Sequence, residues 1–246
     1  IFARLLKAHP YSNLVPEVRW RLAEIDFERG QYADAGREYR VLSAVHSPFS
    51  LKAKYKMAAT LFAQGSYEKA AADFMALTKL SVAERSTDNP DAETIYEEAL
   101  DYLAHLKAKG VQLNMDEPLD ALVTEHLANA YRRVKDEDGF RKTYLNFAAA
   151  RPMARRTPHF MNEVIESYEG EDKSELAQGV RDRFIIALGP DSMFWSRYKE
   201  DVNISTEALD YFETNLLASG QYYGEKAKRT KSRRDLEFAL RYYSRF

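Results

Sequence analysis

Cysteine is absent from the 246-residue chain, which excludes disulfide bonds, thiolate metal ligands and a cysteine nucleophile. Glycine and proline are also few, with 10 and 8 residues. The longest segments are rich in Ala, Leu, Glu, Lys and Arg, which favour helix over strand. The sequence therefore predicts an all-α protein, in which most of the 16 Tyr and 13 Phe pack between helices.

The charge balance and the apolar runs exclude further classes. Basic and acidic residues nearly cancel, 36 against 38, so no global field draws the chain to nucleic acid or to an anionic bilayer. No apolar run approaches the roughly 20 residues of a membrane helix, and we expect no membrane-spanning segment. The opening residues IFARLLKAHP contain neither an initiator Met nor a signal peptide. We therefore expect a mature form or a fragment of a longer chain.

One stretch of the sequence recurs after 35 residues, from Gly30 to Gly65. ERGQYADAGREY at 28–39 is followed by AQGSYEKAAADF at 63–74. Apolar residues on both sides of each glycine recur every three or four positions, the period of a helix. The pattern predicts two antiparallel helices joined at the glycine, which readily adopts the left-handed conformation that ends a helix.

Small residues stand where the two helices of each hairpin would cross most closely. They are Ala23 and Ala35 in the first copy and Ala58 and Ala70 in the second. A larger side chain at a crossing would force the helix axes apart. Because each hairpin alone buries only one side, successive hairpins are expected to stack.

This spacing resembles the tetratricopeptide repeat, whose usual period is about 34 residues. The matching residues are Leu22, Ala23, Gly30, Tyr32, Ala35, Tyr39 and Pro48. The stretch PEVRWRLAEIDFERGQY is most similar to the variant found in bacterial cell-envelope proteins of the Tol-Pal coordinator and β-barrel-assembly lipoprotein type. The resemblance implies a superhelical solenoid of antiparallel helix hairpins that binds other proteins.

The resemblance is uneven along the chain. Clear repeats cover 16–47 and 51–82, degenerate repeats are expected over 91–190, and a partial repeat over 220–246. Within the degenerate part, HLANAYRRVKDEDGFRKTYLNF fits if its turn is three residues longer. No linker divides the chain, so we expect one domain over 1–246.

Active-site patterns are missing from the sequence. There is no GxSxG elbow, no GxxxxGK[ST] or GxGxxG loop and no EF-hand loop. No two of the five histidines have the i, i+4 spacing that would place both on one metal. We therefore expect no enzyme activity, no catalytic residue, no metal site and no cofactor.

Two candidate binding surfaces remain. In tetratricopeptide arrays the first helices line a concave groove for peptides or partner helices, which implies a groove role for Trp20, Glu24, Phe27, Tyr55 and Phe62. The alternative is that these aromatics only pack on neighbouring helices. The second surface is the basic run EKAKRTKSRR at 225–234, with Lys226, Lys228, Arg229, Lys231, Arg233 and Arg234. It suits an acidic partner or lipid head groups, or it is a solvated helix face; without interleaved aromatics we expect no nucleic acid.

The end of the sequence predicts an uncovered apolar face. In LEFALRYYSRF at 236–246, Leu240, Tyr243 and Phe246 fall on one side of a second repeat helix. Solenoids need a polar cap, so we expect a further helix beyond 246 or the docking of another chain there. The alternative is that the aromatics fold back on the preceding helix.

The function expected from the sequence is therefore a non-enzymatic scaffold for proteins or peptides. The resemblance implies a bacterial envelope complex for secretion, motility or outer-membrane biogenesis, in the periplasm or at the outer membrane. The alternatives are a cytoplasmic adaptor or regulator, or the non-catalytic helical domain of a larger enzyme.

Overall fold

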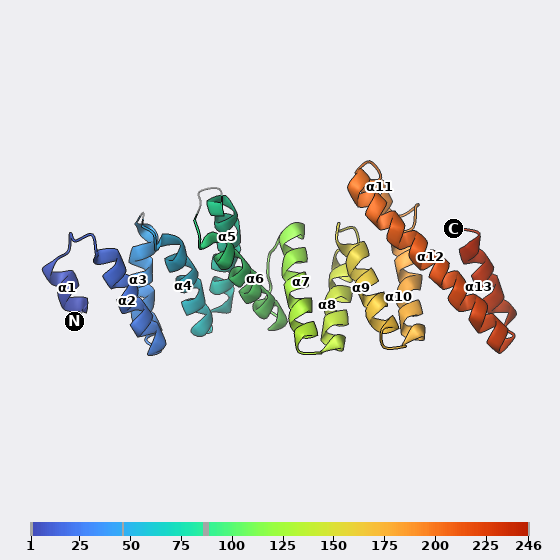
Figure 1. Cartoon of the computed structure of the whole chain (residues 1–246), viewed down its shortest axis with the longest axis horizontal. Coiled ribbons are helices and arrows are strands. Elements are labelled where there is room, and N and C mark those ends of the chain that lie inside the picture. The colour runs from blue at the N-terminus through green and yellow to red at the C-terminus, as the bar shows by residue number, and fades with distance from the viewer. Residues whose placement is uncertain (1, 46, 86–88, 246) are drawn as a thin grey trace. The chain divides into compact units, whose positions relative to one another are not determined.

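The described part of the computed structural model is entirely helical (Figure 1). It comprises residues 2–45, 47–85 and 89–245, which contain thirteen α-helices and no strand. The helices are α1 (Phe2–Ala8), α2 (Val15–Glu28), α3 (Tyr32–Ala44), α4 (Ser50–Ala63), α5 (Tyr67–Arg85), α6 (Ala92–Ala108), α7 (Glu117–Arg133), α8 (Glu137–Ala150), α9 (Thr157–Glu169), α10 (Ser174–Ala187), α11 (Met193–Tyr198), α12 (Val202–Thr230) and α13 (Arg233–Tyr243). The predicted all-α class is confirmed.

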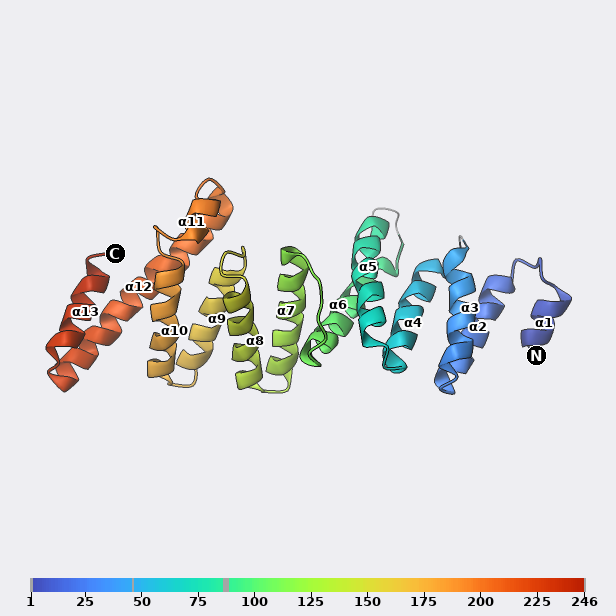
Figure 2. The same ribbon diagram turned by 180° about the vertical axis from the view of Figure 1, so that it is seen from behind.

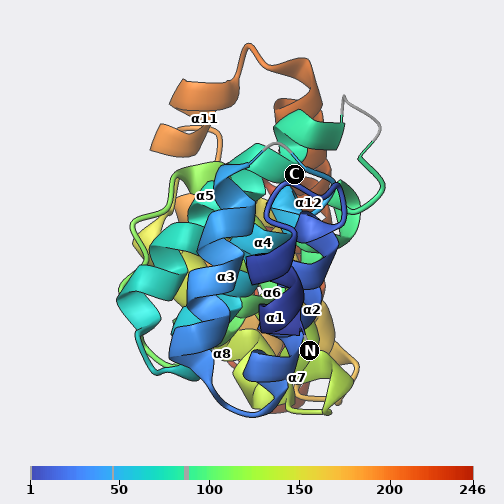
Figure 3. The same cartoon turned by 90° about the vertical axis from the view of Figure 1, so that its left-hand side faces the viewer.

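The chain forms two compact units, residues 1–127 and 128–246, here called unit 1 and unit 2. In unit 1, each helix from α1 to α5 packs against the next one along the chain. Figure 3 views this unit with α1, α2 and α3 nearest the reader. In unit 2, α8 packs on α9, α9 on α10, α10 on α12, and α12 on α13, a pair that is seen side by side in Figures 1 and 2. A single solenoid over 1–246 stays a prediction.

Five of the described helix ends share one hydrogen-bonding pattern, whether or not they contain glycine. After α2, Gly30 N–H donates to the Phe27 carbonyl and Gln31 N–H donates to the Asp26 carbonyl. This is the Schellman motif, with Gly30 in the left-handed conformation at a φ of 73°. The same pair of bonds follows α4, α6, α7 and α9, where the left-handed residues are Gly65, Gly110, Lys135 and Asp172.

The longer turn expected in the degenerate part is wrong. Residues 134–136 separate α7 from α8, just as 29–31 separate α2 from α3. Because the two turns have equal length, Phe140 takes the place that Ala35 has in the first hairpin. A turn three residues longer would have put Phe140 at an aromatic position of the repeat, whereas it lies at a small one.

The four alanines expected at the helix crossings are buried. Ala23, Ala35, Ala58 and Ala70 each have 0% exposed surface. The hairpin that holds Phe140 has a different small residue, Gly139. A Cβ atom at this position would lie 2.6 Å from the Tyr131 ring, so a glycine there lets the ring of α7 approach α8.

Enlarging a crossing residue should separate the helices. We expect Ala35→Leu to lower the free energy of unfolding by about 1–3 kcal/mol, because extra methylenes in a packed core force side chains and backbone to shift. Urea denaturation measures the effect. Ala33→Leu is the matched control, since Ala33 lies exposed on the same helix. Equal midpoints for both variants would show that Ala35 does not limit the helix approach.

Candidate functional site

The three groove candidates on α2 contact neighbouring side chains of unit 1. The Trp20 ring stacks on Phe49, with 5.6 Å between ring centroids, and contacts Tyr39 at 5.7 Å. Glu24 accepts hydrogen bonds from the Tyr39 hydroxyl and, at 3.1 Å, from Lys56 Nζ. The same Nζ lies 5.2 Å from the centre of the Phe27 ring. Lys56, which the sequence did not single out, thus connects two of the candidates.

The two candidates on α4, Tyr55 and Phe62, both contact the same residue of α6. Tyr102 lies 6.1 Å from Tyr55 and 5.0 Å from Phe62 between ring centroids, and it stacks on buried Phe74 at 4.4 Å. The pKa of Tyr55 is raised, mainly by burial and to a smaller extent by a hydrogen bond to Glu98. All five candidates are half-buried and in contact with other helices. A direct role in partner binding stays a prediction for them.

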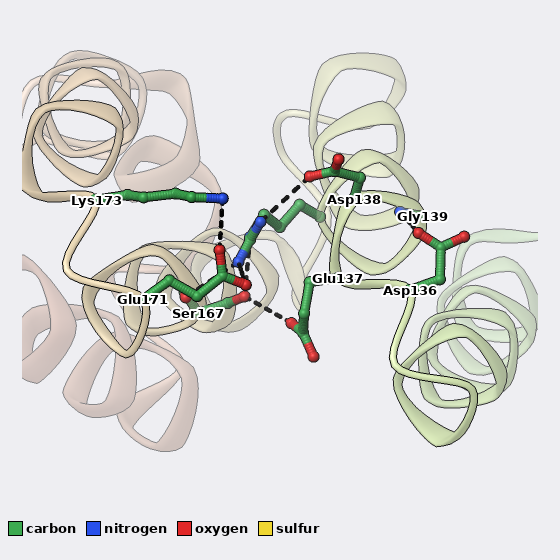
Figure 4. A network of polar contacts seen from close by, with 8 residues as sticks. Asp136, Glu137, Asp138, Gly139, Ser167, Glu171 and Lys173 are labelled. Atoms are coloured by element: carbon green, nitrogen blue, oxygen red, sulfur yellow. Dashed lines mark hydrogen bonds and ion pairs between the residues drawn. The ribbon is translucent and has the colours of Figure 1, made fainter.

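A charged cluster in unit 2 surrounds Arg141, whose side chain is only 2% exposed. Its Nε donates to Ser167 Oγ at 2.9 Å, and its terminal nitrogens contact Asp138 at 3.3 Å and Glu171 at 2.5 Å. Figure 4 shows Ser167 and Glu171 on one side of the cluster and Asp138 on the other. The guanidinium therefore ties α8 to the segment around the end of α9.

The polar groups of this cluster satisfy one another. Ser167 Oγ donates to Glu137 at 2.8 Å, and Lys173 Nζ lies 2.6 Å from Glu171. Hydrogen bonds from Lys173 and then from Arg141 hold the pKa of Glu171 below its ordinary value. A buried cation with its hydrogen bonds made is typical of a structural junction, and we assign the cluster this role.

A groove between α12 and α13 is the candidate functional site of unit 2. Its volume is about 670 Å³, and we call it the α12–α13 groove. Its lining residues are Gln221, Gly224, Glu225, Ala227, Lys228, Lys231, Ser232, Arg233, Leu236, Ala239, Leu240 and Tyr243. Part of the predicted basic run and part of the predicted uncovered face thus line one groove.

The apolar side of the groove is exposed. Leu236, Leu240 and Tyr243 have 50%, 59% and 45% of their surface accessible. Of the three residues expected to form the uncovered face, Leu240 and Tyr243 are exposed, and Phe246 lies outside the described residues. The apolar row begins earlier than expected, because Leu236 belongs to it.

The six residues of the basic run lie in three different places in the structure. Lys228, Lys231 and Arg233 line the α12–α13 groove, whereas Lys226 and Arg229 line a separate 740 Å³ pocket. The Arg234 guanidinium lies 5.5 Å from the centre of the Phe238 ring. Half of the run therefore contributes to the candidate site.

A polar anchor holds the two helices that form the groove. Asp182 of α10 accepts hydrogen bonds from the Tyr223 hydroxyl at 2.8 Å and from the Tyr242 hydroxyl at 2.7 Å. Burial, and next the bonds to Asp182, raise the pKa of both phenols. The two rings stack 5.7 Å apart. One carboxylate thereby ties α12 and α13 to α10.

Close packing of α12 on α13 sets the floor of the groove. A Cβ atom at Gly224 would lie 4.0 Å from the Ala239 Cβ, and one at Gly220 would lie 2.8 Å from the Tyr243 ring. Ala227 on α12 and Ala239 on α13 add two further small residues, and both are buried. The two glycines were missed, although their spacing of four residues places both on one face of α12.

Removing the anchor should loosen α13. In Asp182→Ala, both tyrosine hydroxyls lose their acceptor, and we expect a loss of about 1–3 kcal/mol in unfolding free energy. The backbone amides of α13 should exchange with deuterium faster than in the unmodified chain, as mass spectrometry measures. Asp210→Ala, at an exposed position of α12, is the control. Unchanged exchange in α13 would show that Asp182 does not anchor it.

No family model matches this chain, and no curated protein matches it. Among the described residues, no three His, Cys, Asp or Glu side chains are grouped so that they could hold a metal ion. None of the described helices has both the length and the apolar character needed to cross a membrane.

Proposed function

We propose that this protein is a non-enzymatic scaffold that binds other proteins, with the α12–α13 groove as one contact surface. The observation that carries the proposal is the exposed row of Leu236, Leu240 and Tyr243 inside a groove with a charged rim. Contiguous exposed apolar surface surrounded by polar groups is typical of interaction sites. A surface of this kind recognises a partner without chemical steps.

The tetratricopeptide resemblance supports the same function. Buried alanines at the crossings of the first two hairpins and the recurring Schellman turns agree with a chain of similar hairpin repeats. We include in the proposal that these hairpins stack as a solenoid, because stacked hairpins present extended binding surfaces. The second binding surface of the scaffold would then involve the half-buried aromatics of α2 and α4.

The proposed location is the bacterial envelope, and it rests on the resemblance alone. Fractionation of the native host with an antibody against the chain tests it. The scaffold function does not depend on whether the protein lies in the envelope or in the cytoplasm, since the groove carries no information on compartment.

Photo-cross-linking in the native host tests the groove directly. A photoreactive amino acid at position 240 should give a discrete adduct with one partner, which mass spectrometry identifies and purified components reproduce. Position 209 is the matched control, because Leu209 is also an exposed leucine of unit 2, at 41%. The proposal fails if the two positions give the same adducts, or if position 240 gives none.

A further inference from the structure

We propose that the α12–α13 groove binds one amphipathic helix of another protein, and that carboxylates flank the apolar face of this helix. The inference rests on the proposed scaffold function and specifies the partner at the same site. It follows from two independent features of the groove, its apolar geometry and its rim charges.

The apolar geometry suits a helix. Leu236, Leu240 and Tyr243 stand at i, i+4 and i+7 on α13, so they form one ridge along that helix. Beside the ridge the floor consists of Gly224, Ala227 and Ala239, whose small side chains allow a third helix to approach. Ridges of one helix fit between ridges of another in this way, and partner helices dock in apolar grooves through anchors with the same spacing.

The charged residues that line the groove determine which charge is favoured beside the apolar face of the partner helix. The groove is lined by the cations Lys228, Lys231 and Arg233 and by a single anion, Glu225. Glu225 is paired with Lys228 at 2.8 Å, and Arg233 is paired with Glu237 at 3.2 Å. Lys231 forms no ion pair with any residue that the structure describes. The excess of positive charge favours a partner helix with acidic flanks, because complementary potentials raise the association rate and reject partners of like charge.

A lipid bilayer and nucleic acid fit the same groove less well. The exposed apolar residues line a hollow between two helices, whereas a bilayer presents a broad surface that would leave the floor uncovered. No aromatic side chain in the basic run is available for stacking on bases, which single-stranded nucleic acid requires. A helix fills the groove and meets the rim charges at once.

Designed peptides test the inference on the full chain. The probe is a fluorescent peptide of about 18 residues, or five helical turns, with leucines at i, i+3, i+4 and i+7 and glutamates beside them. A second peptide has lysines in place of these glutamates, and a third has the composition of the first in scrambled order. Fluorescence anisotropy should give a Kd for the acidic peptide at least about tenfold below those of the other two. Its affinity should fall with added salt.

Variants locate the binding. Leu240→Gln should weaken the acidic peptide about tenfold and Lys231→Glu several-fold. The matched controls Leu209→Gln and Lys199→Glu alter exposed residues of unit 2 outside the groove and should leave the Kd unchanged. Since Leu240 and Lys231 are themselves exposed, circular dichroism should show an unchanged fold for all four variants.

Three outcomes would overturn the inference. Equal affinity for the acidic and basic peptides would remove the charge selection. Binding of vesicles rich in phosphatidylserine, lost in Leu240→Gln while no peptide binds, would assign the groove to a membrane. Adducts at position 240 in cells without binding of any peptide would leave the scaffold function standing and exclude an acidic helix as the occupant.

Discussion

Phe74→Ala will lower the free energy of unfolding of unit 1 by about 3–5 kcal/mol. The Phe74 side chain has 0% exposed surface and stacks on Tyr102 at 4.4 Å, with Tyr55 at 6.3 Å on another side. The ring therefore joins α5 to α4 and α6. Its loss leaves a cavity between three helices, and the surrounding rings can refill that cavity only in part.

The two tryptophans allow the two units to be followed separately. Trp20 lies in unit 1 and Trp195 in unit 2, and the chain has no third tryptophan. With Trp195 replaced by Phe, the fluorescence of Trp20 during urea denaturation reports on unit 1. The control is Tyr11→Ala, because Tyr11 is 97% exposed and exposed substitutions change stability by about 0.5 kcal/mol or less. Similar midpoints for both variants would contradict the central packing role of Phe74.

Arg141→Ala should destabilise unit 2 by about 3–5 kcal/mol. The change removes a buried cation, its hydrogen bonds to Ser167 and the packing of its guanidinium 4.3 Å from the centre of the Tyr168 ring. Among the described residues, Glu171 then keeps Lys173 alone as a cationic partner. With Trp20 replaced by Phe, the fluorescence of Trp195 during urea denaturation measures the loss.

Two further variants separate charge from volume at this position. Arg141→Met fills much of the space without a charge, and it should recover part of the stability, since apolar replacements of buried ion pairs are often tolerated. Arg133→Ala removes an exposed arginine of the same unit and should change the midpoint little. If Arg141→Ala matched Arg133→Ala, the cluster would contribute nothing to stability.

The first two hairpins could be predicted from the sequence because local rules and tertiary packing agree there. Gly30 and Gly65 mark the turns, and alanines mark the crossings, so two signals support the same register. Farther along, Lys135 and Asp172 adopt the left-handed conformation. This conformation is usually adopted by glycine. Such positions cannot be recognised from residue type, so no glycine marks the turn after α7 in the sequence.

The candidate site was predicted in pieces. The basic run and the uncovered apolar face are local patterns, so each was visible in the sequence. The attachment of both groove helices to α10 depends in part on Asp182, which contacts residues 41 and 60 positions away. Contacts over such separations follow from the packing of α10 on α12 and leave no periodic signal. For Trp20 and Phe62, a packing role and a binding role demand the same residue type, so the pattern cannot distinguish them.

The Schellman turns without glycine have a consequence for how such a chain diverges. Main-chain groups supply both hydrogen bonds of the motif, and a side chain in the left-handed conformation costs only about 1–2 kcal/mol. A residue other than glycine can therefore occupy this turn with the geometry kept, as the turns at Lys135 and Asp172 show. If the hairpins are repeats of one another, their likeness would persist in the backbone after the residue identities have changed. Distant kin of this chain are better sought by turn geometry than by residue matches.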